Sequence, residues 1–366
     1  MHSLLLHNFH SSLAARFGTV AGAEVVLDYG DQAAEHAALQ ERAMLIDLSF
    51  RGRVCLTGAD RVRFLHGQVT NDIKGLQPGQ GSYAALVNTK GRMESDLNIF
   101  CLTDELLLDF EPGLTEDVTQ RLGKYVVADD VQVVDVGALY GLLSVQGPQA
   151  EKVIISSGVF QQCPNEKYSF TKSSDPNLGE VYLMNVPRLG RTGFDLFAPA
   201  EVLETLARKL LAAAQAVGGR GGGWEAFEAT RIEAGIPRFG VDMDDTNFPQ
   251  ECGIEQSAVS YNKGCYIGQE VLNRIHTMGH VNRELRGLIL ARGLKPLPAK
   301  GEKLFRADKE VGCITSAVVS QSLNQNIGLA IIRRDAGEIG TELELRGTEG
   351  TSSARVVALP FKAVSD

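Results

Sequence analysis

Short apolar runs alternate with helix-forming segments along residues 1–283 of the chain. Each apolar run ends at a glycine or a polar turn, as strands commonly do. The runs at 54–56 and 142–146 are each followed by a glycine and then by a residue that favours a helix start, Asp60 in the first case and Pro148 in the second. This repeated strand–glycine–helix junction indicates two similar α/β units.

Local chemistry predicts the other elements of this region. The sequence Asn-Thr-Lys-Gly at 88–91 favours a hairpin turn between strands at 83–87 and 96–102. A helix cap at Asp31 predicts a helix over 31–46. The remaining predicted elements are strands at 106–108, 131–136, 181–186 and 194–197, and helices at 112–125, 201–217 and 224–234.

The pattern changes after Arg283, where short β-rich runs alternate with glycines and charged turns. This spacing is typical of a compact all-β domain. We therefore expect a domain boundary here, with two α/β subdomains in residues 1–283 and an all-β domain in residues 284–366. The predicted strands of the second domain are 285–290, 311–319, 327–332, 343–345 and 354–357.

Composition and charge exclude several classes of protein. At 366 residues the chain is too long for one simple core. Its formal net charge of −9 argues against general affinity for nucleic acids, which bind cationic surfaces. No apolar run approaches the roughly 20 residues of a membrane span. The six cysteines include no Cys-x-x-Cys pair, so neither a zinc site nor a disulfide framework is predicted. We expect a cytoplasmic protein without a membrane anchor.

The stretch from Lys263 to Glu270 reads Lys-Gly-Cys-Tyr-Ile-Gly-Gln-Glu and lacks apolar periodicity. Its two glycines favour unusual backbone conformations or the close approach of a ligand. Because Lys263 stands two residues from Cys265, it favours the thiolate, which is a nucleophile and a soft metal ligand. The alternative for Cys265 is burial as a small hydrophobic residue. The stretch lies next to the predicted domain boundary, where small-molecule sites tend to form.

Several further short motifs are distributed along most of the chain. They are Ile-Asp-Leu-Ser at 46–49, Gly-Ala-Asp at 58–60, Thr-Asn-Asp at 70–72, Asn-Thr-Lys-Gly at 88–91, Val-Gln-Gly-Pro at 145–148, Arg-Ile-Glu-Ala-Gly-Ile-Pro at 231–237 and Pro-Gln-Glu at 249–251. In this combination the sequence resembles the glycine-cleavage T-protein superfamily of folate-binding proteins. The stretch 263–270 is similar to the marker of its YgfZ branch, which is implicated in iron–sulfur protein maturation. Aminomethyltransferases resemble it with an Asp where Cys265 stands.

The resemblance implies an α+β fold, with two ferredoxin-like α/β domains and a C-terminal β-barrel around a central folate-binding hole. It also implies tetrahydrofolate as the cofactor. Three positions depart from the T-protein pattern. Ser95 replaces one of a pair of acids and leaves only Asp96, and Phe227 stands where an arginine holds the folate tail. Arg191 is the nearest counterpart of a pterin-binding glutamate. These departures argue against aminomethyl transfer.

A folate site needs an aromatic or apolar slot, a carboxylate or amide facing the pterin, and a cation for the anionic tail. The candidates for the slot and the pterin edge are Tyr83, Asn88, Asp96 and Glu233, and those for the cation are Lys263, Arg274, Arg92 and Arg283. Three of these residues also have an ordinary structural alternative. Tyr83 would be a half-buried strand residue, Asp96 would be hydrogen-bonded by turn amides, and Glu233 would lie on a solvated helix face.

We therefore expect a tetrahydrofolate-binding accessory protein of iron–sulfur cluster assembly or repair. Its partners would be iron–sulfur proteins or assembly factors, and Cys265 would act in redox or cluster chemistry. The alternative is a tetrahydrofolate-dependent aminomethyltransferase of the glycine cleavage type, in which Asp96 polarises the folate nitrogen. A tRNA-associated scaffold is a third interpretation, which the acidic balance disfavours.

Overall fold

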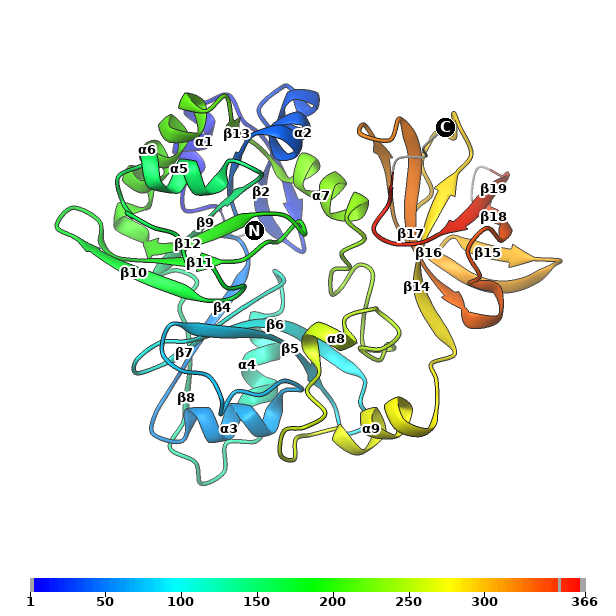
Figure 1. Ribbon diagram of the computed structural model, residues 1–366, viewed down its shortest axis with the longest axis horizontal. Coiled ribbons are helices and arrows are strands. Elements are labelled where there is room, and N and C mark those ends of the chain that lie inside the picture. Colours follow the sequence, from blue (N-terminus) through cyan, green and yellow to red (C-terminus); the bar gives the residue numbers. More distant parts are fainter. Residues whose placement is uncertain (1–2, 348–349, 363–366) are drawn as a thin grey trace. The chain divides into compact units, whose positions relative to one another are not determined.

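The computed structural model describes residues 3–347 and 350–362 (Figure 1). The chain divides into two compact units. The first unit consists of Met1–Ala84 and Ser95–Glu228, and the second of Ala85–Glu94 and Ala229–Asp366. None of the helices in the described ranges combines the length and the apolar character that a membrane span requires.

The first unit contains a mixed sheet with the strand order β10-β11-β12-β9-β3-β13. Its neighbours pair antiparallel except for β13 and β3, which run parallel. Helices α5 and α6 pack together against this sheet, and the apolar positions of α6, such as Leu206 and Leu210, enter the core beneath them (Figure 1). The outward side of α6 carries charged residues, which is why the helix is amphipathic. The bounds are β3 (Met44–Asp47), β9 (Tyr140–Gln146), α5 (Ala150–Ser156), β10 (Phe170–Asp175), β11 (Gly179–Asn185), β12 (Gly193–Pro199), α6 (Leu203–Ala216) and β13 (Arg220–Gly221).

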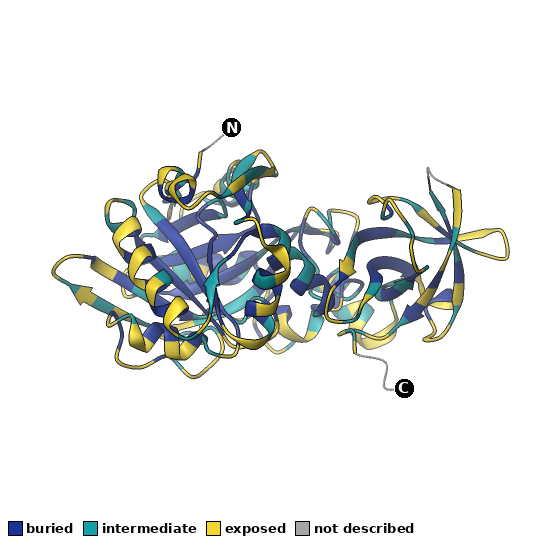
Figure 2. Ribbon diagram, turned by 90° about the horizontal axis from the view of Figure 1, so that it is seen from above, coloured by how far each residue is buried: buried dark blue, intermediate teal, exposed yellow. Residues whose placement is uncertain are grey.

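A smaller antiparallel sheet has the strand order β5-β6-β7-β4-β8, and α4 packs on β4 and β8. One core joins this sheet to the larger one: the ring of Phe100 from β6 meets the ring of Phe197 from β12 at a centroid distance of 6.2 Å. Figure 2 shows the strands as buried and the outer sides of the helices as exposed. The bounds are β4 (Gly52–Thr57), α3 (Arg61–Gln68), β5 (Gln80–Val87), β6 (Met93–Cys101), β7 (Leu106–Phe110), α4 (Thr115–Gly123) and β8 (Gln132–Asp135), and α1 (His7–Ser12), β1 (Arg16–Val20), β2 (Ala23–Asp28) and α2 (Gln32–Glu41) precede them.

The second unit contains a closed barrel with the strand order β14-β17-β16-β15-β18-β19. Alternate residues of its strands, such as Leu288 and Leu290, point into a core of aliphatic side chains. Helix α7 leads from the first unit into the second. The bounds are α7 (Trp224–Glu233), α8 (Glu255–Ala258), α9 (Gln269–Met278), β14 (Arg283–Leu290), β15 (Lys303–Arg306), β16 (Lys309–Ser320), β17 (Gln325–Arg333), β18 (Glu342–Gly347) and β19 (Gly350–Val357).

The structure confirms the predicted α+β class with a C-terminal β-barrel. The helix predicted over 31–46 is wrong at its C-terminal end, because α2 ends at Glu41 and Met44–Asp47 form strand β3. All four residues of β3 are buried between β9 and β13. A short apolar run of this kind cannot be assigned to helix or strand by its periodicity alone.

Candidate functional site

Two predicted site residues meet on neighbouring strands of the smaller sheet. The hydroxyl of Tyr83 on β5 donates a 2.8 Å hydrogen bond to Oδ2 of Asp96 on β6. The other carboxylate oxygen, Oδ1, is buried and has no hydrogen-bond partner among the described residues. Ser95, whose side chain is buried, turns its hydroxyl to the carbonyl of Asp96 and not to the carboxylate. A buried acceptor without a donor is costly, which makes Asp96 a candidate for contact with a bound group.

The surroundings of Asp96 make it an acid–base group in the neutral range. Burial raises the pKa of the Asp96 carboxyl to about 6, and the negative charge of Glu111 acts in the same direction. The hydrogen bond from Tyr83 and the positive charge of Arg51 oppose this rise. A carboxyl with such a pKa can accept and return a proton near pH 7. Strongly perturbed carboxyls of this kind are typical of functional sites.

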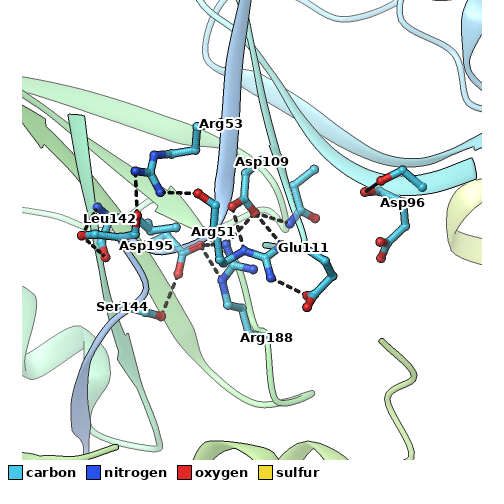
Figure 3. A network of polar contacts seen from close by, with 12 residues as sticks. Arg51, Arg53, Asp96, Asp109, Glu111, Leu142, Ser144, Arg188 and Asp195 are labelled. Carbon is cyan, nitrogen blue, oxygen red and sulfur yellow. Dashed lines mark hydrogen bonds and ion pairs between the residues drawn. The ribbon is translucent and has the colours of Figure 1, made fainter. Parts of the chain in front are cut away.

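A network of buried ion pairs lies beside this carboxyl (Figure 3). Arg188, from the loop between β11 and β12, donates to Asp109 of β7 at 2.7 Å and to Asp195 of β12 at 2.8 Å, and so links the two sheets. Arg51 binds Asp109 and also Glu111, which lies on the Asp96 side of the network. Although burial acts to raise the pKa of Asp109, Arg188 and Arg51 hold it below its usual range.

Sequence reasoning missed this network, although one signal for it was present. Asp109 interrupts the apolar run Leu-Leu-Leu-Asp-Phe at 106–110, and a charge inside a buried strand requires a partner. The partners themselves cannot be identified from the sequence, because Arg51 and Arg188 lie far from Asp109 along the chain. Arg191, which the resemblance singled out, is exposed and donates to the carbonyl of Gln40.

The loop before α9, in the second unit, presents the predicted cysteine to solvent. Cys265 is exposed. The neighbouring Lys263 and Tyr266 are buried, and the Lys263 ammonium lies 4.8 Å from the centre of the Tyr266 ring. The Tyr266 hydroxyl has no hydrogen-bond partner in the described part of the chain, and burial raises its pKa to about 12. The exposed thiol therefore lies on a loop that the buried side chains of Lys263 and Tyr266 hold in place.

Gly268 fixes where this loop becomes a helix. It precedes α9 with φ of +82°, and a Cβ at this position would lie 2.5 Å from the carbonyl oxygen of Asn88. We expect Gly268→Ala to lower the free energy of unfolding by about 2 kcal/mol, because alanine meets both the strained φ and the backbone contact. Urea denaturation checks this value. Gly253→Ala is the control, since Gly253 also has a positive φ but open space around it. Equal losses in the two variants would contradict the contact argument.

The other predicted residues of the second unit have partners of different kinds. Asn88 accepts hydrogen bonds from the amides of Lys90 and Arg92 and so closes the β5–β6 turn. Glu233 accepts a 2.6 Å hydrogen bond from Ser320 of the barrel. Arg274 is exposed on α9.

The structure thus brings Tyr83 and Asp96 together in the first unit and Lys263 and Cys265 together in the second. The carbonyl of Asn88 approaches Gly268, at the end of the loop that carries this second pair. His276 lies within α9, where it stacks on Tyr261 and contacts Glu255 at 2.9 Å.

Comparison with known proteins identifies the family of the chain. The profile of the GCVT N-terminal domain matches residues 6–263, and that of the glycine cleavage T-protein C-terminal barrel domain matches residues 283–362. Two curated relatives, both named aminomethyltransferase, are those of Geobacillus kaustophilus (28% identity, 97% of each chain) and Thermosipho melanesiensis (30% identity, 97% of this chain and 96% of the relative). The crystal structure of the glycine cleavage system aminomethyltransferase T from Bartonella henselae has the same fold, with a TM-score of 0.87 at 24% identity over 98% of both chains. The chain belongs to the glycine cleavage T-protein family.

Proposed function

We propose that this protein binds tetrahydrofolate against the Tyr83–Asp96 pair of the first unit. One observation carries the proposal: a carboxylate with a buried, unpartnered oxygen stands beside an aromatic ring on the same sheet. Reduced folate presents ring N–H groups that such an oxygen would accept, and the tyrosine ring offers an aromatic surface. Membership of a folate-binding family supports the same ligand.

Titration calorimetry with tetrahydrofolate tests this proposal. We expect heat of binding from the wild-type protein and a loss of affinity of at least about tenfold in Asp96→Ala, because a charge-assisted hydrogen bond disappears. Asp104→Ala is the control, since Asp104 is an exposed carboxylate near the end of the same strand, β6. Absence of binding by the wild-type protein would refute the proposal, and so would equal affinity in the wild type and Asp96→Ala.

The first candidate for the use of this folate is one-carbon transfer, since the curated relatives are named aminomethyltransferase. Tetrahydrofolate supplies a nitrogen that carries the one-carbon unit when it is bound. Asp96 would hold the proton at its Oδ1 and release it, and Tyr83 would keep the carboxylate oriented through Oδ2. Release of methylene-tetrahydrofolate from an aminomethyl-lipoyl substrate by the pure protein would establish this candidate, and its absence under saturating tetrahydrofolate would exclude it.

The second candidate is an accessory role in iron–sulfur cluster assembly or repair, and the exposure of Cys265 favours it. Phe227, at the position where T-proteins hold the folate tail with an arginine, is buried and stacked on Trp224 at 5.3 Å, so the core fills that place. Ser95 likewise replaces an acid of the transferase pattern and donates its hydroxyl to a backbone carbonyl. In this role the thiol, and not the folate, would meet the partner protein.

We expect Cys265→Ser to fold normally and to bind tetrahydrofolate with unchanged affinity, because the thiol is exposed and packs against no core. If the second candidate is correct, the variant should fail to restore iron–sulfur enzyme activity in cells that lack this protein. Cys313→Ser, a change at a partly exposed cysteine of the barrel, serves as the control. Full restoration by Cys265→Ser would remove the cysteine from the mechanism.

A further inference from the structure

Strand β10 lies at the edge of the larger sheet, and one side of its backbone is open (Figure 1). β10 pairs antiparallel with β11, and no described strand pairs with its other side. In an antiparallel pair, the N–H and C=O groups of alternate residues point away from the partner strand. The amide of Phe170 points away from β11, since it donates to the carbonyl of Gly79 at 2.8 Å. Lys172 and Ser174 therefore also direct their backbone groups outward.

The outward backbone groups of Lys172 and Ser174 are unpaired. Gly79 supplies one partner for this edge, at Phe170, and the described chain supplies no backbone partner on this side for the two residues that follow in alternation. A row of unpaired N–H and C=O groups is a template for a further strand. Many proteins bind extended peptides in this way, by adding them to the open edge of a sheet.

A groove of about 580 Å³ lies beside β10. Its lining includes Phe170 and Lys172 of β10, Tyr182 of β11 and, from the smaller sheet, the turn between β6 and β7 at residues 102–105. Lys172 and Tyr182 are register partners, so their side chains lie on the same face of the sheet. A strand added to β10 would place every second side chain on that face, in the groove.

The charges of the groove favour a basic occupant. Its lining carries the carboxylates of Asp104, Glu105 and Glu180 and the ammonium of Lys172. A lysine on an edge strand commonly prevents pairing with other chains, but Lys172 is bound to Glu180 at 2.7 Å and so is neutralised. Asp104 and Glu105 have no ion-pair partner within the described ranges. Lysine or arginine side chains of an added strand would complement these two charges.

We propose that β10 is a docking strand for a partner protein, which adds an extended segment with lysine or arginine at alternate positions to the open edge. The outward groups of Lys172 and Ser174 would bind the backbone of this segment, and Asp104 and Glu105 would bind its basic side chains. The docking strand is separate from the proposed tetrahydrofolate site at Asp96, so either can fail without the other.

Two labelled heptapeptides, one of alternating valine and lysine and one of alternating valine and glutamate, test this inference. Fluorescence anisotropy measures their affinity, and hydrogen exchange of residues 170–175 locates the binding. We expect the lysine peptide to bind at least about tenfold more tightly than the glutamate peptide and to slow the exchange of the β10 amides. Ser174→Pro should weaken its binding about tenfold, because proline lacks the outward N–H and is tolerated on edge strands. Ser174→Ala, the matched control, keeps this N–H and should bind as the wild type does.

Asp104→Lys alters the opposite wall of the groove and leaves β10 intact, so it provides a test even if Ser174→Pro unfolds the hairpin. It should weaken the binding of the lysine peptide and strengthen that of the glutamate peptide. No binding of the lysine peptide, equal affinity for the two peptides, or equal binding by Ser174→Pro and Ser174→Ala would overturn the inference. Self-association of the wild type that Ser174→Pro abolishes, measured by sedimentation velocity, would assign the edge to a second copy of the chain and overturn it as well.

Discussion

Arg188→Leu is expected to lower the free energy of unfolding by about 3–5 kcal/mol, the usual cost of removing one partner from a buried ion pair. Arg188 is buried and neutralises two aspartates, Asp109 and Asp195, that are fully buried themselves. Asp109 keeps Arg51 and the amide of Asn98 in the variant, but among the described residues Asp195 keeps only the hydroxyl of Ser144. A carboxylate without a cation in such a place must either stay charged at high cost or take up a proton.

Urea denaturation of Arg188→Leu at pH 7 measures this loss. The matched control is Arg63→Leu, because Arg63 forms ion pairs with Asp60 and Asp129 at the surface of the same unit. Surface pairs of this kind contribute little, so the control should unfold at nearly the wild-type midpoint. A small loss in Arg188→Leu, similar to that of the control, would show that the network does not hold the two sheets together.

Asp96→Asn is expected to stabilise the protein above pH 6 while it weakens tetrahydrofolate binding at the proposed site. The folded state raises the pKa of Asp96 from the ordinary 3.8 to about 6, so between these values it binds more protons than the unfolded state. Stability therefore falls as the pH rises from about 4 to about 6, and the full penalty is present above that range. Removing the charge should recover about 3 kcal/mol at pH 8, with no gain below pH 4.

The difference between the unfolding free energies of Asp96→Asn and the wild type, measured from pH 4 to pH 8, tests this expectation. Because both proteins share every other titrating group, the difference isolates Asp96. Asp104→Asn, a change at an exposed carboxylate, serves as the control. A destabilised Asp96→Asn at pH 8 would mean that the charged form is favoured by the fold, contrary to the raised pKa.

The parts of the fold that follow from local chemistry were predictable from the sequence. The turn at 88–91 carries its own cap, since Asn88 binds the amides of Lys90 and Arg92, and strands β5 and β6 flank it as expected. The barrel strands also follow from alternation and turn spacing. Strand β3 was not predictable, because its position between β9 and β13 is set by distant segments.

Candidate site residues could be proposed from the sequence, but the electrostatics around them could not. The sequence and the family resemblance pointed to Tyr83 and Asp96, yet the pKa of Asp96 depends on Glu111 and Arg51, which β7 and the β3–β4 connection bring beside it. The positive φ of Tyr168, in the turn before β10, also leaves no trace in the sequence, since no glycine or asparagine marks it. Such features arise from packing between the two sheets of the first unit.

The central claim is that the Asp96 carboxylate binds reduced folate, and the pH dependence of tetrahydrofolate affinity tests it most directly. Because the ionised carboxylate accepts a ring N–H more strongly than the neutral acid does, the wild-type affinity should be constant above pH 7 and fall as the pH drops below 6. Asp96→Asn should bind weakly with no step in this range. The same pH profile in the wild type and Asp96→Asn would contradict the account, because Asp96 would then not be the group that meets the folate.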